Sequence, residues 1–232
     1  MILWTRRGEG MRGALAAGAL VGLAAAVKTP LGLAVLALLP TARSWREAGT
    51  VAAAAVAVPL AMLAPFLVAD ASGTVDAFRY SGLPGQGGLS LIVQPHVVDA
   101  WVGHTPLYEE KNLLEPVTGL INAAVIAGIL LVTVRRRAPA VPAAIFVWLA
   151  VFAFGSGFTF SFVLWLVPFL LLAGHLRAAV LAQVAMVPPA LLLVTAPFDA
   201  PVPAAYAVWM IVAWLATVAA LAVAYRGLAR TA

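Results

Sequence analysis

The residues that could bind or act on a polar ligand are concentrated in one stretch of this sequence, the polar insert Asp70–Glu115. It holds six of the nine acidic residues, two of the three histidines and the longest glycine-rich run. Carboxylates and imidazoles are the usual general acids and bases, and guanidinium groups bind anions. We therefore expect the chemistry in this insert, and the apolar segments on either side of it should form the frame that positions it.

One cation lies outside the insert, within an apolar run. Lys28 is followed by Thr29 and Pro30, and a proline interrupts a helix because it lacks a backbone N–H and disfavours helical geometry at the preceding residue. An ammonium group at membrane depth is costly unless it reaches the interface or finds an anion. The pattern predicts capture of a lipid phosphate by Lys28 at the outer boundary of the membrane. The alternative is a snorkelling lysine without a ligand.

A second cation stands beside the glycine-rich run. Arg79 lies between Phe78 and Tyr80 and precedes the segment 82–88. A guanidinium suits phosphate or carboxylate binding, and exposed backbone amides of a glycine run add to such a site. The run lacks the Lys-Ser/Thr ending of a P-loop and the strand-to-helix context of a dinucleotide fingerprint. The alternative is a solvated linker in which Arg79 pairs with Asp76.

The remaining polar and aromatic residues give weaker signals. The spacing of His96, Asp99 and His104 does not match a zinc site, so we expect no metal and no cofactor. The chain has no cysteine, which excludes disulfides and thiolate chemistry. One aromatic group near Gly155 could line a channel for a lipid chain or stack on a sugar, but ordinary aromatic packing and an interface belt are the favoured explanation. Its members are Phe160, Phe162 and Trp165, with Pro168 beside them.

Composition identifies an integral membrane protein. Hydrophobic residues make up 64% of the 232 residues and charged residues only 10%, and a soluble domain could not cover so much apolar surface. The net charge of +5 does not indicate nucleic-acid binding, because the basic residues form short clusters between apolar runs and not a basic face with interleaved aromatics. We expect an all-α, polytopic transmembrane bundle that forms a single domain, residues 1–232.

The apolar runs and basic clusters predict eight membrane passes in the plasma membrane, with both termini cytoplasmic. Eleven of the 14 basic residues then fall on the inner side, as the positive-inside rule requires. The predicted passes are the two arms of Gly13–Leu39 on either side of Lys28–Pro30, followed by Thr50–Ala69, Val117–Val134, Val141–Phe154, Phe162–Gly174, Ala178–Thr195 and Ala204–Tyr225.

Two of the predicted hairpins are too short for a hydrocarbon core of about 30 Å. These are the hairpins that turn at Lys28 and at Gly155. Non-helical backbone at membrane depth is tolerated only where it is buried in protein or lines a cavity. The sequence therefore predicts two recessed turns and a cavity open to the outer side, roofed by the polar insert.

Several segments resemble the C-terminal half of the polytopic GT-C fold glycosyltransferases, in particular the mannosyl- or arabinofuranosyltransferase-like proteins of glycosyltransferase family 87. The similar segments are Gly18–Gly22 with Lys28–Pro30, the helix FTFSFVLWLVPF at 158–169, and RYSGLPGQGGLS at 79–90. The resemblance implies transfer of a sugar from a polyprenyl-phosphate donor to an acceptor on the outer face. On this basis the expected substrate-binding residues are Lys28 and Arg79 at the donor phosphate, and Tyr80, Gln94 and His96 at the sugar or acceptor.

The chain departs from that family in one respect. The family's acidic residues lie in a first outer loop near the N-terminus, and no segment of this sequence matches that loop. We therefore assign no catalytic residue, and Asp70 and Asp76 are not given that role. The apolar Met1–Trp4 is interpreted either as the tail of a preceding helix or as an ordinary N-terminus. The first interpretation makes the chain the C-terminal half of a longer protein, or the partner of a separate N-terminal subunit.

Two other function classes stay open at this point. Broken helices and recessed hairpins also build the sites of transporters and lipid flippases, although the sequence has no repeated half and little intramembrane charge besides Lys28. The third class is a non-catalytic membrane scaffold, the remnant of an enzyme. Binding of a lipid-linked sugar, its transfer, and solute flux distinguish the three.

Overall fold

A computed structural model describes residues 10–78, 87–94, 113–157, 164–184 and 205–230, and these are all helices, turns and short connections. Four helices are long and apolar enough to cross a membrane: α2 (Gly10–Val27), α4 (Trp45–Ala69), η3 with α8 (Glu115–Val117 and Thr118–Arg135), and α12 (Ala205–Arg230). Only 11% of the most apolar window of α8 and of α12 is buried. Such apolar surfaces need a lipid environment, so the chain is a multi-pass membrane protein.

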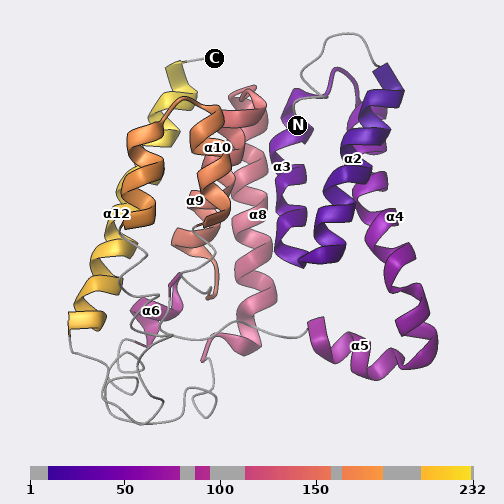
Figure 1. The fold of residues 1–232 in the computed structure, drawn as a ribbon, viewed down its shortest axis with the longest axis horizontal. Coiled ribbons are helices and arrows are strands. Elements are labelled where there is room, and N and C mark those ends of the chain that lie inside the picture. Colours follow the sequence, from indigo (N-terminus) through magenta and orange to yellow (C-terminus); the bar gives the residue numbers. More distant parts are fainter. Residues whose placement is uncertain (1–9, 79–86, 95–112, 158–163, 185–204, 231–232) are drawn as a thin grey trace.

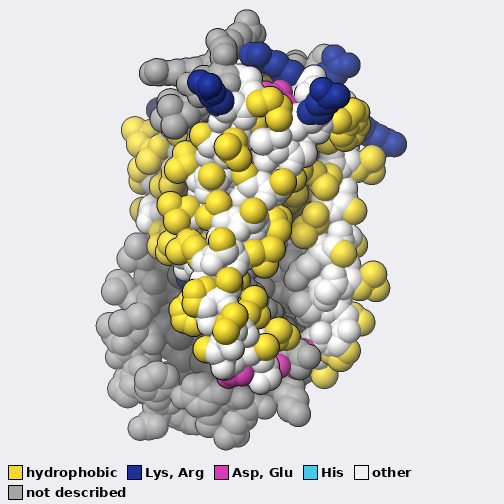
Figure 2. Space-filling model, turned by 90° about the vertical axis from the view of Figure 1, so that its right-hand side faces the viewer, with side chains coloured by type: hydrophobic (Ala, Val, Ile, Leu, Met, Phe, Trp, Pro, Cys, Tyr) yellow, Lys and Arg dark blue, Asp and Glu magenta, His cyan; other side chains and the backbone are white. Residues whose placement is uncertain are grey.

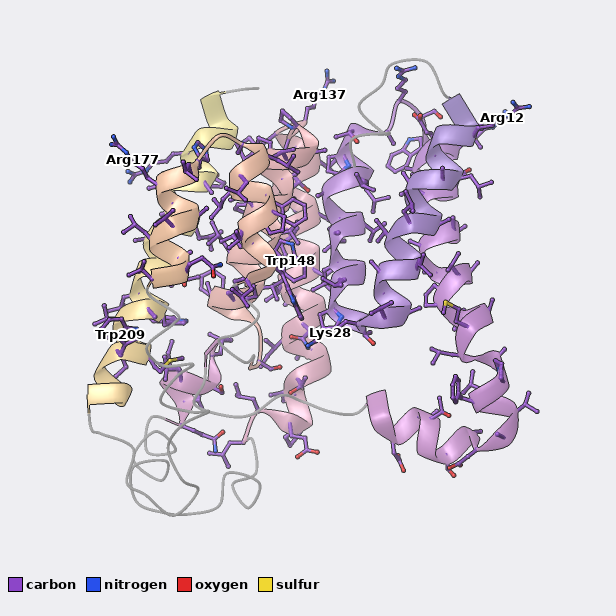
Figure 3. All side chains as sticks on the ribbon, in the orientation of Figure 1. Arg12, Lys28, Arg137, Trp148, Arg177 and Trp209 are labelled. Atoms are coloured by element: carbon purple, nitrogen blue, oxygen red, sulfur yellow. The ribbon has the colours of Figure 1, made fainter. Side chains whose placement is uncertain are left out.

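The helices run alternately in opposite directions, and the basic residues gather at one end (Figure 1). We call this the basic end. The space-filling view places Lys and Arg side chains there and acidic side chains mainly at the opposite, acidic end (Figure 2). Arg12, Arg137 and Arg177 all point away from the ribbon at the basic end (Figure 3). The charge separation expected from the sequence is thus present in the folded chain.

The N-terminal hairpin turns at Lys28, as predicted from the proline at position 30. α2 ends at Val27, Lys28 has extended backbone (φ −151°, ψ 106°), and the chain returns toward the basic end through η1 (Thr29–Ala34), α3 (Val35–Leu38) and η2 (Leu39–Thr41). Pro30 stands in the first turn of η1, where a missing N–H costs nothing. The hairpin is therefore built from one full helix and one short, largely 3₁₀ return.

α2 packs closely against α4 because its contact face consists of small residues. A Cβ atom added at Gly18 would lie only 2.4 Å from the backbone oxygen of Val51, and one added at Gly22 would lie 2.9 Å from that of Ala55. Gly18 and Gly22 form the small-xxx-small pattern that lets membrane helices approach each other. α4 begins at a Ser44 cap, whose hydroxyl accepts the Glu47 N–H at 3.2 Å, and it stays helical through Pro59 and Pro65.

The second half of the chain surrounds one central helix, α9 (Ala140–Phe154). It is apolar on all sides, and most of its residues are buried. Residues of α3, α8, α12 and α10 (Val167–Leu172) join it in one hydrophobic core. The Trp214 indole N–H donates to the Ala153 carbonyl at 3.0 Å and fixes α12 against the end of α9. Residues 176–184 form a further helix between α10 and α12.

Parts of the polar insert are also described. Ala71–Phe78 forms α5, which turns sharply away from α4 at Asp70 (Figure 1), and Ser90–Val93 forms the single turn α6. Residues 79–86 and 95–112 lie outside the described part of the chain, as do 158–163 and the expected outer turn within 185–204.

Candidate functional site

The two short hairpins turn at similar depths from the basic end. α2, with 18 residues, spans about 27 Å and α9, with 15, about 22 Å, whereas α4, with 25, spans about 37 Å. α2 and α4 both have one end at the basic end (Figure 1). The Lys28 turn therefore lies roughly 10 Å short of the far end of α4, and the Gly155 turn lies at comparable depth. Both turns are recessed relative to the far end of α4, but the expectation that both hairpins are too short to span is wrong for α2, whose 18 residues make it one of the four candidate spans.

Lys28 and Trp165 meet at this depth. The Lys28 Nζ lies 5.1 Å from the centroid of the Trp165 ring, within the range of a cation–π interaction. Trp165 belongs to the turn that leads into α10, far from Lys28 in sequence. The Lys28 side chain is exposed and that of Trp165 half-buried. The structure thus joins the two hairpins through two residues that the sequence analysis had singled out separately.

Behind Trp165, a row of stacked rings continues into the core. Trp148 contacts Trp165 edge-on, with ring centroids 5.3 Å apart, and stacks on Phe152 at 5.8 Å. Trp148 is 1% exposed, and its indole N–H has no hydrogen-bond partner among the residues that the structure describes. A buried donor left unpaired costs about 1–3 kcal/mol. Sequence reasoning passed over Trp148, and its only signal was a tryptophan in the middle of an otherwise aliphatic and phenylalanine-rich segment.

A described part of the polar insert packs onto the Gly155 turn. The Leu89 N–H donates to the Gly155 carbonyl at 2.8 Å and the Ser90 N–H to the Ser156 carbonyl at 3.2 Å. Gly88 makes this approach possible, because its φ is +65° and an added Cβ would lie 2.3 Å from the Gly155 oxygen. These bonds satisfy backbone groups that would be costly at membrane depth.

Gln94, expected to contact sugar or acceptor, ends this segment in a buried position. It is 1% exposed, and its Oε1 accepts the Leu113 N–H at 2.8 Å. Its side chain therefore holds two parts of the insert together in this conformation. Arg79, Tyr80 and His96, the other expected binding residues, lie outside the described residues.

Asp70 has a structural task at the junction of α4 and α5. Its carboxylate accepts the Gly73 N–H at 2.9 Å and the Ser72 hydroxyl at 2.8 Å. The Gly73 hydrogen bond, followed by that of Ser72, lowers the pKa of this exposed carboxyl below its ordinary value. An N-cap aspartate at the start of α5 explains these contacts without a catalytic role.

Among the described residues, the candidate site, which we call the recess because both turns stop short of the far end of α4, thus combines the exposed Lys28 ammonium group, an aromatic wall and hydrogen-bonded backbone of the insert. Such a set suits an anionic group carried by an amphiphilic molecule, because the cation binds the charge while the rings contact apolar or sugar surface. In comparisons with protein-family models, curated proteins and solved structures, no match to this chain was found.

Proposed function

We propose that this chain is the membrane portion of a glycosyltransferase that uses a polyprenyl-phosphate-linked sugar on the outer face of the plasma membrane. The position of Lys28 carries the proposal: it is an exposed ammonium group at a recessed helix break, against the face of Trp165. The phosphate of a lipid-linked sugar is an anion that an exposed ammonium group at that depth can bind. The sugar-transfer chemistry rests on the family resemblance of the segments quoted above.

The proposal includes eight passes with both termini in the cytoplasm. The alternating direction of the helices and the collection of arginines at one end support this topology (Figures 1 and 2). The acidic end and the polar insert then face outward. Lys28 lies nearer to this side, where a lipid phosphate at the outer leaflet can reach it.

In the proposed reaction, the cations act on the leaving group. Lys28, joined by Arg79 from the insert, neutralises the phosphate that departs from the anomeric carbon, and departure is easier when that charge is matched. Trp165 presents an aromatic face to the sugar or the first isoprene units. Tyr80, Gln94 and His96 contact the sugar or acceptor, and for Gln94 this requires release of its bond to Leu113. The acid–base residue that activates the acceptor hydroxyl is not assigned to this chain.

Binding of a polyprenyl-phosphate sugar to the purified protein in nanodiscs tests the proposal. Losing one charge-assisted contact weakens binding by about 10- to 150-fold, so we expect that loss in Lys28→Ala and in Arg79→Ala. Arg12→Ala is the matched control, since Arg12 is an exposed cation on the same helix as the Lys28 hairpin but at its opposite end (Figure 3). Unchanged affinity in both Lys28→Ala and Arg79→Ala would falsify the phosphate role of these residues.

A lipid or solute transporter is the second candidate, because both recessed turns break helices within the membrane, as transporter sites do. Flux of a lipid-linked sugar in proteoliposomes, without transfer to an acceptor, would favour it. Transfer without flux would favour the enzyme. A chain that binds no lipid-linked sugar at all would be a scaffold.

A further inference from the structure

We propose that the basic end of the molecule holds a binding site for the phosphate of anionic membrane lipids in the cytoplasmic leaflet, centred on Arg135–Arg137 of α8 and on Tyr225 and Arg226 of α12. This site lies at the opposite end from Lys28 (Figure 3). It is independent of the reaction proposed for the recess, and the two can fail separately.

Arg136 is the anchored member of the site. Its Nη2 donates to the Tyr225 hydroxyl at 3.2 Å, and its guanidinium carbon lies 5.4 Å from the centroid of the Tyr225 ring. Tyr225 is held in turn by Phe146, with ring centroids 6.4 Å apart. A guanidinium has five N–H donors, and this arrangement engages one edge of it. The remaining donors of a pre-oriented, half-exposed group are left for an acceptor such as a phosphate.

Among the residues that the structure describes, no acid pairs with the positive charge around Arg136. Arg135, Arg137 and Arg226 are exposed, and within the described ranges no carboxylate lies at ion-pair distance from them. Glu47, an acid described at this end, is occupied by its own helix start, where its carboxylate accepts the Arg43 N–H at 2.6 Å. A concentration of positive charge at the membrane surface attracts anionic lipid headgroups.

The backbone of Arg137 indicates that an arginine is kept here at some cost. α8 ends in a Schellman motif, in which the Ala138 N–H donates to the Thr133 carbonyl and the Arg137 N–H to that of Val134. Arg137 occupies the left-handed position of this motif with φ +44°, where glycine is usual. The matching motif after α10 has Gly174 there, at φ +75°. A guanidinium at position 137 thus replaces the residue that the local geometry prefers.

Apolar side chains directly beneath these arginines make a lipid the favoured occupant. Leu131 and Val134 on α8 and Val223 on α12 lie within about one helical turn of the basic residues, and each is about half exposed or more. A phospholipid supplies both a phosphate for the guanidinium groups and acyl chains for these side chains. Free phosphate and acidic peptides supply only an anionic group for the guanidinium groups and no acyl chains.

The experiment compares binding of phosphatidylglycerol and phosphatidylcholine to the full chain in nanodiscs, read as lipid-dependent thermal stability and as retained lipid in native mass spectrometry. The wild type should prefer phosphatidylglycerol, and this preference should fall with rising ionic strength. Arg136→Gln combined with Arg137→Gln should reduce this preference by more than about 30-fold, because two basic residues near an anionic surface contribute that much without direct contact and the Tyr225-anchored guanidinium adds hydrogen bonds to the phosphate. Arg12→Gln combined with Arg46→Gln removes the same charge elsewhere at this end. This double variant should reduce the preference for phosphatidylglycerol several-fold less than the Arg136/Arg137 double variant does.

Each contrary result has a definite meaning. Equal binding of both lipids by the wild type overturns the proposal without reference to any variant. An equal loss in the two double variants reduces the site to general surface charge, which also overturns it. If inorganic phosphate displaces bound phosphatidylglycerol as strongly as free lipid does, the acyl contacts have no role and the occupant is not a lipid. If the chain binds polyglutamate in preference to phosphatidylglycerol, the surface belongs to an acidic protein partner instead.

Discussion

Replacing Gly18 by alanine should separate α2 from α4. The added Cβ would lie 2.4 Å from the Val51 oxygen and 2.8 Å from the Ala54 Cβ, whereas ordinary contacts begin at 3.4 Å. α2 must therefore move away by about 1 Å, because the closest obstacle is backbone and cannot rotate aside. Overpacking of this kind costs about 1–3 kcal/mol, and a gain in helix propensity of about 0.5–1 kcal/mol offsets part of it.

Gly128→Ala is the matched control for this prediction. Gly128 lies within the apolar helix α8, and a Cβ added there meets nothing within 4 Å. This variant keeps the propensity gain without the collision, so the two variants should differ by the overpacking cost alone, roughly 1–3 kcal/mol in free energy of unfolding. Gly22→Ala should fall between them, since its closest atom is at 2.9 Å.

Unfolding in mixed micelles with increasing dodecyl sulfate, followed by tryptophan fluorescence, measures the difference. Size-exclusion chromatography before titration checks that each variant starts from a monodisperse state. If Gly18→Ala unfolds at the same detergent fraction as Gly128→Ala, α2 does not pack on α4 through its glycines. The close approach described for these helices would then be wrong.

Three further predictions follow from backbone geometry and capping. Arg137→Gly should stabilise the fold by up to about 1 kcal/mol, because relief of its positive φ outweighs the entropy cost of glycine, whereas Gly174→Ala should destabilise it; thermal unfolding in phosphatidylcholine alone, which keeps the proposed lipid site out of the comparison, measures both. Gly88→Ala should release the insert from Gly155, seen as faster amide exchange of Leu89 and Ser90, and unchanged exchange would contradict that contact. Asp70→Asn should loosen α5 at neutral pH. Because the folded pKa of Asp70 is depressed, the Asp70 carboxylate stabilises α5 above its ordinary pKa near 4, and this stabilisation is lost as pH falls through the folded value. Amide exchange in α5 of the variant and of the wild type should therefore become equal in acid.

Sequence reasoning gave some element boundaries well and missed others: α4 begins at Trp45 behind the Ser44 cap, five residues before the expected Thr50. The break at Lys28 was predicted from Pro30, and the helices 118–135 and 140–154 begin and end within one residue of the expected positions. Proline stereochemistry and charge asymmetry act locally, so they can be read from the chain without knowing its partners. The prediction of an all-α membrane protein is confirmed on the same grounds.

Contacts between distant segments could not be predicted in this way. The Lys28–Trp165 interaction depends on which faces of the two hairpins meet, and runs that are apolar all round carry no periodicity to indicate a face. The buried position of Gln94 was missed for a different reason. A glutamine in a polar insert looks like a surface residue, yet here its Oε1 pairs with the Leu113 backbone inside the protein.

The depth of the two recessed turns links these observations. An ammonium group at Lys28, the indole N–H of Trp148, which has no hydrogen-bond partner among the described residues, and the hydrogen-bonded polar backbone at Gly155 lie at this level. A longer α9 and an aliphatic residue at position 28 would each make the fold more stable, because each change removes polar groups from the apolar layer. An arrangement that keeps several such groups together is expected where a polar ligand enters the membrane. The recess is therefore a better guide to the function of this chain than its exposed acids, of which Asp70 is already committed to capping a helix.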